Sequence, residues 1–173
     1  MGNDANPSDK FTPPDFAHSC EEDISYMKAS PDNKFLAVGY GCKKIRIFNI
    51  DNNTFVADFE GCCMTKMDST RVSLDFSPDS KHLAYRWEKS IRFLDMESLQ
   101  KVREINNECA PVTIAYSPNG NFILTGNNKD LIKVYDLNKD SSVSKIFEAK
   151  ARTVTSMDKG WTHRTEPKWS PDG

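Results

Sequence analysis

The stretch Val112–Thr125, VTIAYSPNGNFILT, contains the pattern that decides the fold of this chain. A short apolar segment leads into Ser117-Pro118-Asn119-Gly120, and a second apolar segment begins at Phe122. Proline presets the backbone torsion of a tight turn, and asparagine and glycine tolerate the torsions that are required after it. The stretch therefore predicts two short strands that run antiparallel and are joined by a turn.

The same turn signal recurs along the chain at a nearly regular interval. The four copies begin with a Ser-Pro pair and are Ser30–Asn33, Ser77–Ser80, Ser117–Gly120 and Ser170–Gly173. Their prolines are separated by 47, 40 and 53 residues. An interval of about 40–45 residues is typical of a repeated four-stranded unit. The last interval falls to 43 when Asp158–Pro167 is left out, so we expect a local insertion there.

Each unit continues beyond its turn with two further strand-like segments. The predicted third strands alternate apolar and polar residues at their start, and they are Ile45–Phe48, Ile91–Leu94 and Ile132–Tyr135. Such alternation is typical of a half-buried antiparallel strand. Weaker fourth strands follow near Thr54–Phe59, Leu99–Ile105 and Val143–Phe147. No stretch of helical length and periodicity interrupts the units, so the sequence predicts an all-β fold built from four-stranded meanders.

These units resemble the WD-repeat family of β-propellers. The segment Ile132-Lys133-Val134-Tyr135-Asp136 matches the aromatic–Asp ending of that family's third strand, with Leu94-Asp95 and Phe48-Asn49 at the same place in the other units. The Trp-Asp dipeptide itself and the Gly-His pair that usually precedes the first strand are absent from these three units. The resemblance implies β-propeller blades, each a four-stranded antiparallel sheet, that form an incomplete ring of about three and a half blades.

The repeat also predicts the domain organisation. We expect a flexible leader over residues 1–22, because it is rich in proline and polar residues and lacks periodicity. The partial propeller follows over residues 23–173, with blade 1 at about 24–60, blade 2 at about 71–106, blade 3 at about 111–149 and the start of blade 4 at about 153–173. Blades without a neighbour expose apolar sheet faces. We therefore expect a fragment of a longer propeller chain, or a ring completed by a second copy or by another protein.

Composition excludes several classes of protein. The net charge of -2 does not favour binding to nucleic acid, and the absence of a long apolar stretch does not favour a membrane span. The five cysteines form no CxxC pair, which predicts reduced thiols and a cytoplasmic location, with the nucleus as an alternative. No metal-ligand spacing, phosphate-binding loop or nucleophile elbow occurs, so we expect no cofactor, no metal and no catalytic residue.

One set of loops is the best candidate for recognition of other proteins. The resemblance places the connections between second and third strands on one face, together with the connections between blades. The residues expected on this face are Tyr40, Lys43, Arg86, Trp87, Glu88, Asn127, Asn128 and Lys129. Arg86-Trp87 is the expected anchor, because arginine and tryptophan dominate the energetics of protein interfaces. The alternative is that Trp87 packs sideways on a neighbouring loop.

The sequence therefore predicts a non-catalytic scaffold or adaptor that binds other proteins. Two other functions remain open at this point. The chain could be the propeller part of a larger enzyme such as a peptidase, or it could be an RNA-associated factor in which Arg86-Trp87 stacks on bases. The sequence names neither the partner nor the pathway, and it does not give the total number of blades.

Overall fold

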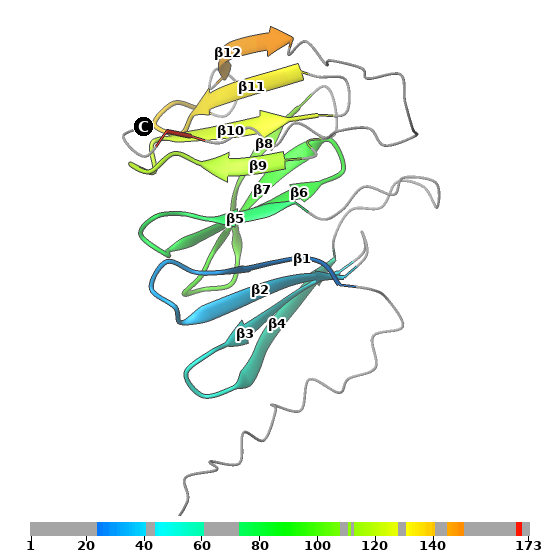
Figure 1. The fold of residues 1–173 in the computed structure, drawn as a ribbon, viewed down its shortest axis with the longest axis vertical. Helices are drawn as coiled ribbons and strands as arrows, with labels where there is room; N and C mark the ends of the chain where they lie inside the picture. Colours follow the sequence, from blue (N-terminus) through cyan, green and yellow to red (C-terminus); the bar gives the residue numbers. More distant parts are fainter. Residues whose placement is uncertain are drawn as a thin grey trace, which may run out of the picture.

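The computed structural model describes residues 24–40, 44–60, 73–107, 111, 113–127, 131–140, 145–150 and 169–170 of the chain. These residues form three four-stranded antiparallel sheets that are stacked one beside the next, and they contain no helix (Figure 1). In every sheet the strands are hydrogen-bonded in chain order. The predicted all-β architecture of four-stranded blades is confirmed, and the three described blades do not close into a ring.

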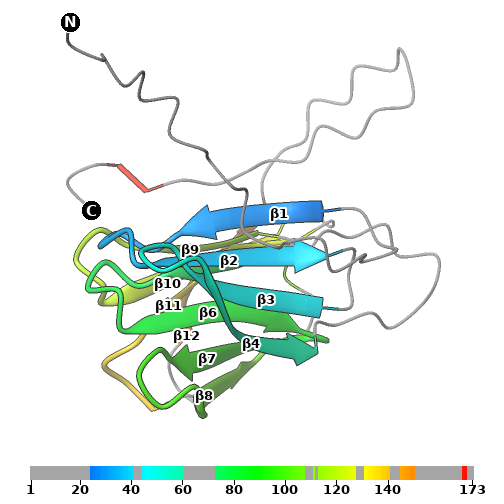
Figure 2. The same cartoon turned by 90° about the horizontal axis from the view of Figure 1, so that it is seen from below.

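Each of the three blades consists of four consecutive strands of three to seven residues. Blade 1 consists of β1 (Ile24–Ala29), β2 (Phe35–Tyr40), β3 (Lys44–Asn49) and β4 (Thr54–Glu60). Blade 2 consists of β5 (Leu74–Phe76), β6 (His82–Trp87), β7 (Ser90–Asp95) and β8 (Lys101–Asn106). Blade 3 consists of β9 (Thr113–Tyr116), β10 (Phe122–Gly126), β11 (Leu131–Asp136) and β12 (Lys145–Lys150). Figure 2 looks along the stack and shows the four strands of blade 1 side by side in chain order. The expected leader and most of the expected fourth blade lie outside the described residues.

Each sheet has two faces, which pack against different neighbours because alternate residues of a strand point to opposite sides. We call the two sides of each blade its A face and its B face. In blade 2 the A face carries Leu83, Tyr85 and Leu94, and the B face is the opposite side. The A face of blade 2 packs on the B face of blade 1, where Ala37 and Ile45 are fully buried. This first core, between blades 1 and 2, also contains Leu74, Phe76, Ile47 and Met96.

The same arrangement repeats one blade further along the chain. The B face of blade 2, with Ala84, Ile91 and Phe93, packs on the A face of blade 3, with Ile123 and Tyr135. A third, smaller cluster lies on the A face of blade 1 and consists of Leu36, Val38, Tyr40 and Phe48. Blade stacking therefore follows one rule in this chain: the A face of each blade covers the B face of the blade before it.

The Ser-Pro turns have the same hydrogen bonds in all three blades. In blade 1 the Ser30 hydroxyl donates to Asp32 Oδ1 at 2.6 Å, and it accepts a hydrogen bond from the Phe35 amide at 2.9 Å. The blade 2 and blade 3 turns reproduce these bonds with Ser77 and Asp79, and with Ser117 and Asn119. The fourth turn residue lies in the left-handed region in each copy, at Asn33, Ser80 and Gly120. The serine is buried in every turn, which explains why the pattern requires this small hydroxyl residue.

The Ser-Pro turns also contact one another along one side of the molecule, at the left of Figure 1. The amide of Asp32 in blade 1 donates to the Ser80 hydroxyl in blade 2 at 3.0 Å. At the next boundary, a Cβ atom built on Gly120 would lie 3.6 Å from the Pro78 ring. The turns therefore help to fix the spacing between neighbouring blades.

Asp75 connects all three blades at their innermost strands, β1, β5 and β9. It is only 6% exposed, and its Oδ1 atom lies 2.6 Å from Lys28 Nζ of blade 1. Its Oδ2 atom accepts a hydrogen bond from the Tyr116 amide of blade 3 at 2.8 Å. The Ser73 hydroxyl adds a parallel bond, since it accepts from the Ile114 amide at 2.8 Å. One carboxylate of blade 2 thus serves as a partner for both neighbours.

Every outermost strand contains a β-bulge at the same place. The register shifts between Ile47 and Phe48 in blade 1, between Phe93 and Leu94 in blade 2, and between Val134 and Tyr135 in blade 3. The extra residue on the outermost strand is Val56, Val102 and Ile146, respectively. A bulge increases the local twist of a strand pair. The sequence pattern of the fourth strands is therefore weak because each of them has a bulge at the equivalent position of its pairing.

We expect Asp75→Ala to lower the free energy of unfolding by about 2–3 kcal/mol, because it leaves the Tyr116 amide without an acceptor in a buried position. Asp75→Asn keeps an acceptor oxygen for that amide and loses only the ion pair with Lys28, so its cost is expected to be smaller. Urea unfolding of both variants measures the difference. Equal losses for the two variants would contradict a stabilising role for the Asp75–Tyr116 hydrogen bond.

The Ser-Pro turns predict a dependence of stability on pH. The hydrogen bond from Ser77 holds the pKa of Asp79 below its ordinary value of 3.8. A carboxylate with a lowered pKa stabilises the fold fully above about pH 4, and this contribution is lost as the pH falls through the folded-state pKa. Asp79→Asn should therefore lose less stability than the wild type between pH 5 and pH 3, both measured by urea unfolding.

Blade 3 supplies the reciprocal control, because Asn119 occupies the position of the aspartate in its turn. Asn119→Asp is expected to add a titrating group to the same hydrogen bond and so to increase the acid sensitivity of the chain. If Asp79→Asn and Asn119→Asp change the acid sensitivity in the same direction, the turn carboxylate is not its source.

Candidate protein-binding face

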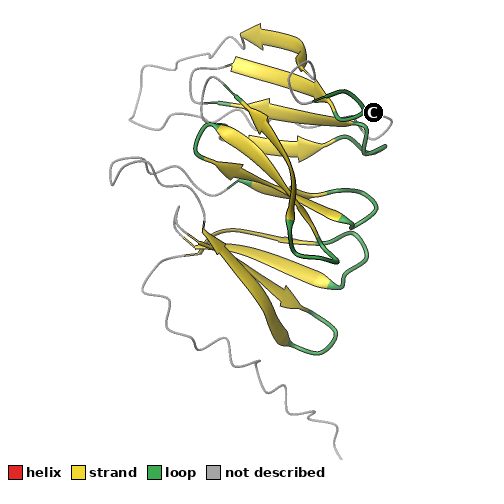
Figure 3. Cartoon of the chain, turned by 180° about the vertical axis from the view of Figure 1, so that it is seen from behind, coloured by secondary structure: helices red, strands yellow, loops and turns green. Residues whose placement is uncertain are grey.

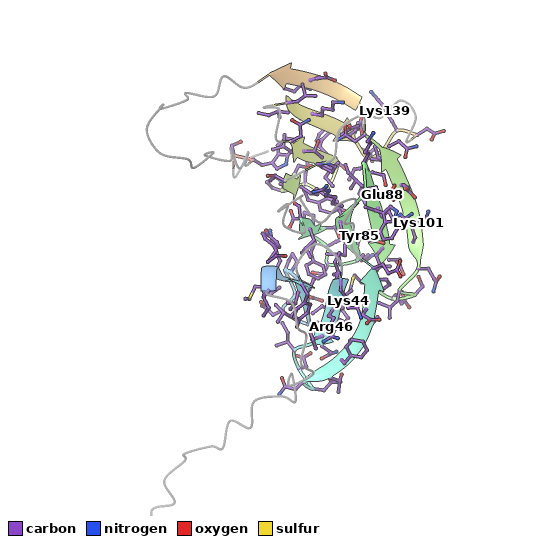
Figure 4. The ribbon with its side chains drawn as sticks, turned by 90° about the vertical axis from the view of Figure 1, so that its right-hand side faces the viewer. Lys44, Arg46, Tyr85, Glu88, Lys101 and Lys139 are labelled. Atoms are coloured by element: carbon purple, nitrogen blue, oxygen red, sulfur yellow. The ribbon has the colours of Figure 1, made fainter. Side chains whose placement is uncertain are left out.

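The connections between second and third strands lie on the side of the molecule opposite the Ser-Pro turns, at the right of Figure 1. Figure 4 looks onto this side and labels Glu88 at the β6–β7 turn. Of the residues expected on this side, Lys43, Asn128 and Lys129 lie outside the described residues. Trp87 and Asn127 are partly exposed, and Glu88 is exposed. The structure therefore describes the blade 2 part of this side most completely.

Arg86 and Tyr40 do not project from loops as expected. Arg86 lies in β6 and is 4% exposed, and its Nε atom donates to the Glu88 carbonyl at 3.3 Å. Strand β6 continues to Trp87 because the β6–β7 connection is a tight turn in which Trp87 pairs with Ser90. Tyr40 is buried at the end of β2. The expected loop position of Arg86-Trp87 is corrected, while a binding role for this side stays a prediction.

The partner of Trp87 in the structure is Arg92, not its sequence neighbour Arg86. The Arg92 guanidinium lies 4.0 Å from the centroid of the indole ring, a distance typical of a cation–π contact. Its Nε atom lies 3.2 Å from Glu104 Oε2 on the next strand. Trp87 also packs against the core between blades 1 and 2. The side chain is therefore held between the core and a charged pair.

Glu104 is the centre of this charged group on blade 2. Its carboxylate accepts hydrogen bonds from Lys101 Nζ and from the Ser90 hydroxyl, both at 2.7 Å. The hydrogen bond from Lys101 contributes most to lowering the pKa of Glu104 to about 2, followed by Ser90 and the charge of Arg92. The carboxylate is therefore ionised throughout the neutral range, and the Arg92–Glu104 pair carries full charges.

A basic residue of the third strand faces an acidic residue of the fourth strand in every described blade. The cross-strand pairs on the A faces are Arg46 and Asp58, Arg92 and Glu104, and Lys133 and Glu148. Lys133 Nζ lies 3.6 Å from Glu148 in blade 3, where the lysine is only 3% exposed. Sequence analysis missed this repeat because the weak fourth strands gave no register. The basic residue at the second position of each predicted third strand was the available signal.

The predicted residues Tyr40 and Trp87 belong to this repeated arrangement. They stand two positions after Val38 and Tyr85, the second-strand residues that face the basic residue. The Arg46 guanidinium lies 5.2 Å from the Tyr40 ring, as Arg92 lies over Trp87. Both aromatic residues therefore cover a cation on an A face, which gives them a role in the blade beside any role in recognition.

The tip of the β6–β7 turn is the best described part of this side that is open to contact with another molecule. Glu88 and Lys89 are both exposed, and Glu88 adopts the left-handed conformation with φ of 51°. The opposite charges of Glu88 and Lys89 follow the partly exposed Trp87 in the chain, so the turn offers polar and apolar contact together. Such a mixture is typical of the surfaces by which proteins bind proteins.

The part of the chain that the structure describes contains neither a candidate metal site nor a candidate membrane-spanning helix. No group of three or more histidine, cysteine or acidic side chains there could hold a metal ion. The described residues likewise contain no helix with the length and apolar character needed to cross a lipid bilayer.

Two further contacts show how blade 3 is connected to its surroundings. The Arg103 guanidinium of blade 2 donates to the carbonyl groups of Leu137 and Lys139 in blade 3. At the inner side, Trp169 Nε1 donates to the Ala115 carbonyl at 3.1 Å, and its ring lies 6.2 Å from that of Phe122. Figure 3 shows the loops that join the strands of the three blades.

Comparison with known protein families gives two matches to one repeat. The model described as "WD domain, G-beta repeat" matches residues 12–49 and residues 100–136. The second match covers β8 to β11, and the first ends with β3 at Asn49, so both end with a third strand. The first match starts at residue 12, within the segment that sequence analysis expects to be a leader. No curated protein sequence matches the chain.

Solved structures share the fold. A hydrazine synthase from Kuenenia stuttgartiensis is similar with a TM-score of 0.59 and 16% identity, over 72% of this chain and 35% of that one. A chain of a mitotic checkpoint complex is similar with a TM-score of 0.61 and 18% identity, over 75% of this chain and 38% of that one. The chain thus spans well under half the length of both structures. Repeats and blades agree: two stretches of the chain match the WD40 repeat, and its three described sheets are β-propeller blades like those of these solved structures.

Proposed function

We propose that this chain is a non-catalytic scaffold that binds other proteins through the side formed by its second-to-third strand connections. The observation that carries the proposal is the β6–β7 turn, which holds exposed Glu88 and Lys89 beside partly exposed Trp87. Arg92, which is itself paired with Glu104, lies over the indole and holds it in place, so little side-chain entropy is lost when a partner covers the exposed part of the ring. A rigid aromatic residue with charged neighbours is a suitable anchor for a protein partner.

The architecture supports the same proposal. Stacked blades present their turns at fixed spacing, because the Ser-Pro turns and Asp75 connect each blade to the next. A surface that is held in place in this way loses little conformational freedom on binding. We place the scaffold in the cytoplasm, with the nucleus as the alternative, because its cysteines form no CxxC pair and are expected to be reduced thiols.

The two alternative functions receive no comparable support. The hydrazine synthase is an enzyme by its name, but a likeness at 16% identity concerns the fold alone. Stacking of RNA bases on Arg86-Trp87 is less favoured, since Arg86 is buried and Arg92 lies over the Trp87 ring. The net charge of -2 also works against an RNA backbone.

A charge exchange in the β6–β7 turn tests the proposal. We expect Glu88→Lys combined with Lys89→Glu to weaken the retention of bound proteins by roughly tenfold, because reversed charges meet a complementary surface unfavourably. The full chain serves as bait in cell extract, and each retained protein is quantified by mass spectrometry for the wild type and the variant. Unfolding in urea should be unchanged, because both side chains are exposed.

The matched control is Glu97→Lys combined with Lys81→Glu, which likewise exchanges two exposed opposite charges, on the side of the Ser-Pro turns, and leaves the net charge unchanged. This variant should retain the same proteins as the wild type. If both variants lose the same proteins to the same extent, recognition does not depend on the β6–β7 side and the proposed site is wrong.

A further inference from the structure

The backbone of the β6–β7 turn is held by hydrogen bonds to three consecutive carbonyl groups, those of Trp87, Glu88 and Lys89. The donors are, in the same order, the Ser90 hydroxyl at 2.9 Å, Arg86 Nε at 3.3 Å and the Asn107 amide at 2.8 Å. All three donor residues are buried, whereas the two residues at the tip of the turn are exposed. The surrounding structure therefore determines the conformation of the turn.

Glu88, labelled in Figure 4, has a backbone conformation that glutamate adopts reluctantly. Its φ of 51° lies in the left-handed region, which glycine and short polar residues tolerate best. Most other left-handed positions that the structure describes carry such residues, namely Asn33, Asn53, Ser80 and Gly120. The remaining one, Leu99, packs against the core between blades 1 and 2, which explains its side chain. Glu88 is exposed, so packing does not explain a glutamate there.

The carboxylate of Glu88 also has no role within the part of the chain that the structure describes. It makes no hydrogen bond or ion pair with any described residue, although Lys89 follows it directly. Glu104 of the same blade, by contrast, accepts hydrogen bonds from Lys101 and Ser90. Residues in unfavourable backbone conformations that the surrounding structure enforces cluster at functional sites. The fold thus accounts for the shape of the turn but not for its glutamate.

On these grounds we propose that Glu88 sets the specificity of the β6–β7 turn by pairing with a Lys or Arg side chain of the partner protein. The proposal rests on the proposed scaffold function and gives its partner a defined chemistry. A carboxylate on a turn that is already fixed loses little backbone freedom on binding. Trp87 precedes Glu88 and is partly exposed, so the turn also offers apolar area to the aliphatic stem of a Lys or Arg side chain.

Lys89 is equally exposed, but it is not the favoured specificity residue. Its backbone does not lie in the left-handed region, so a lysine at this position has no conformational cost to explain. Lysine is also among the residues most often found on protein surfaces. A partner that instead offers a carboxylate to Lys89 is the outcome that would reverse the inference.

A random-peptide phage library tests the chemistry of the partner, with the immobilised full chain as bait. Phage that bind the Glu88→Gln variant are removed first, so that the phage then captured by the wild type depend on the carboxylate. We expect their peptides to be enriched in Lys and Arg relative to the unselected library. Each selected peptide should bind Glu88→Gln roughly tenfold more weakly than the wild type, and added salt should reduce this difference.

Glu97→Gln is the matched control, because Glu97 is an exposed glutamate on the side of the Ser-Pro turns. The selected peptides should bind this variant as tightly as the wild type. A selection that yields no peptides after the subtraction, or peptides without an excess of Lys and Arg, would overturn the inference. So would peptides rich in Asp and Glu, which would make Lys89 the pairing residue.

A second readout needs no ligand. Glu88→Asn should raise the midpoint of urea unfolding, because asparagine tolerates the left-handed conformation better than glutamate does. The same variant should lose binding of the Lys- and Arg-containing peptides. A more stable fold with weaker binding separates a binding role from a structural one, for which the midpoint would fall. An unchanged or lowered midpoint would contradict the argument that the fold alone does not favour a glutamate in this turn.

Failure of this inference can be told apart from failure of the proposed function. If the charge exchange of Glu88 and Lys89 abolishes protein retention while Glu88→Gln retains the same proteins as the wild type, the role of the carboxylate is rejected and the β6–β7 surface stands. If the charge-exchanged chain retains all proteins, the β6–β7 surface itself is rejected, and with it both proposals.

Discussion

The structure depends on the carboxylate of Asp75, which links three sheets that are not paired with one another through their backbones. The strands of each sheet are paired only within that sheet, so the contacts that set the relative positions of the blades must involve side chains. Apolar packing of A faces on B faces supplies most of the free energy, but it is tolerant of small displacements. The bonds of Asp75 to Lys28 and to the Tyr116 amide are directional and therefore fix the relative positions of the inner strands.

Much of this fold is readable from the sequence because its turns are local. A Ser-Pro pair followed by Asp or Asn makes its hydrogen bonds within five residues. Each copy therefore predicts a hairpin from its local sequence alone. The third strands are equally clear, since their alternation survives in every unit. The family resemblance then supplied the grouping into blades, which the two matches to the WD repeat support.

The candidate site was less predictable, because it depends on registers between strands. Arg86 was expected in a loop, but β6 continues through it to Trp87, and the residue is buried. The pairing of Arg92 with Glu104 also escaped prediction, since a bulge between Phe93 and Leu94 displaces the register of β8. A pattern of apolar and polar residues fixes which side a residue takes only while the pairing stays regular.

The bulges in β4, β8 and β12 also affect how the molecule behaves in a crowded solution. An outermost strand offers a row of free amide and carbonyl groups, to which the edge of another molecule could add itself as a further strand. The extra residue at Val56, Val102 and Ile146 interrupts this row, and Lys101, Arg103 and Glu104 place charges along β8. We expect these bulges to oppose edge-to-edge association of the outermost strands of the described blades. Flat, regular strands of the same composition would be more prone to form amyloid-like assemblies.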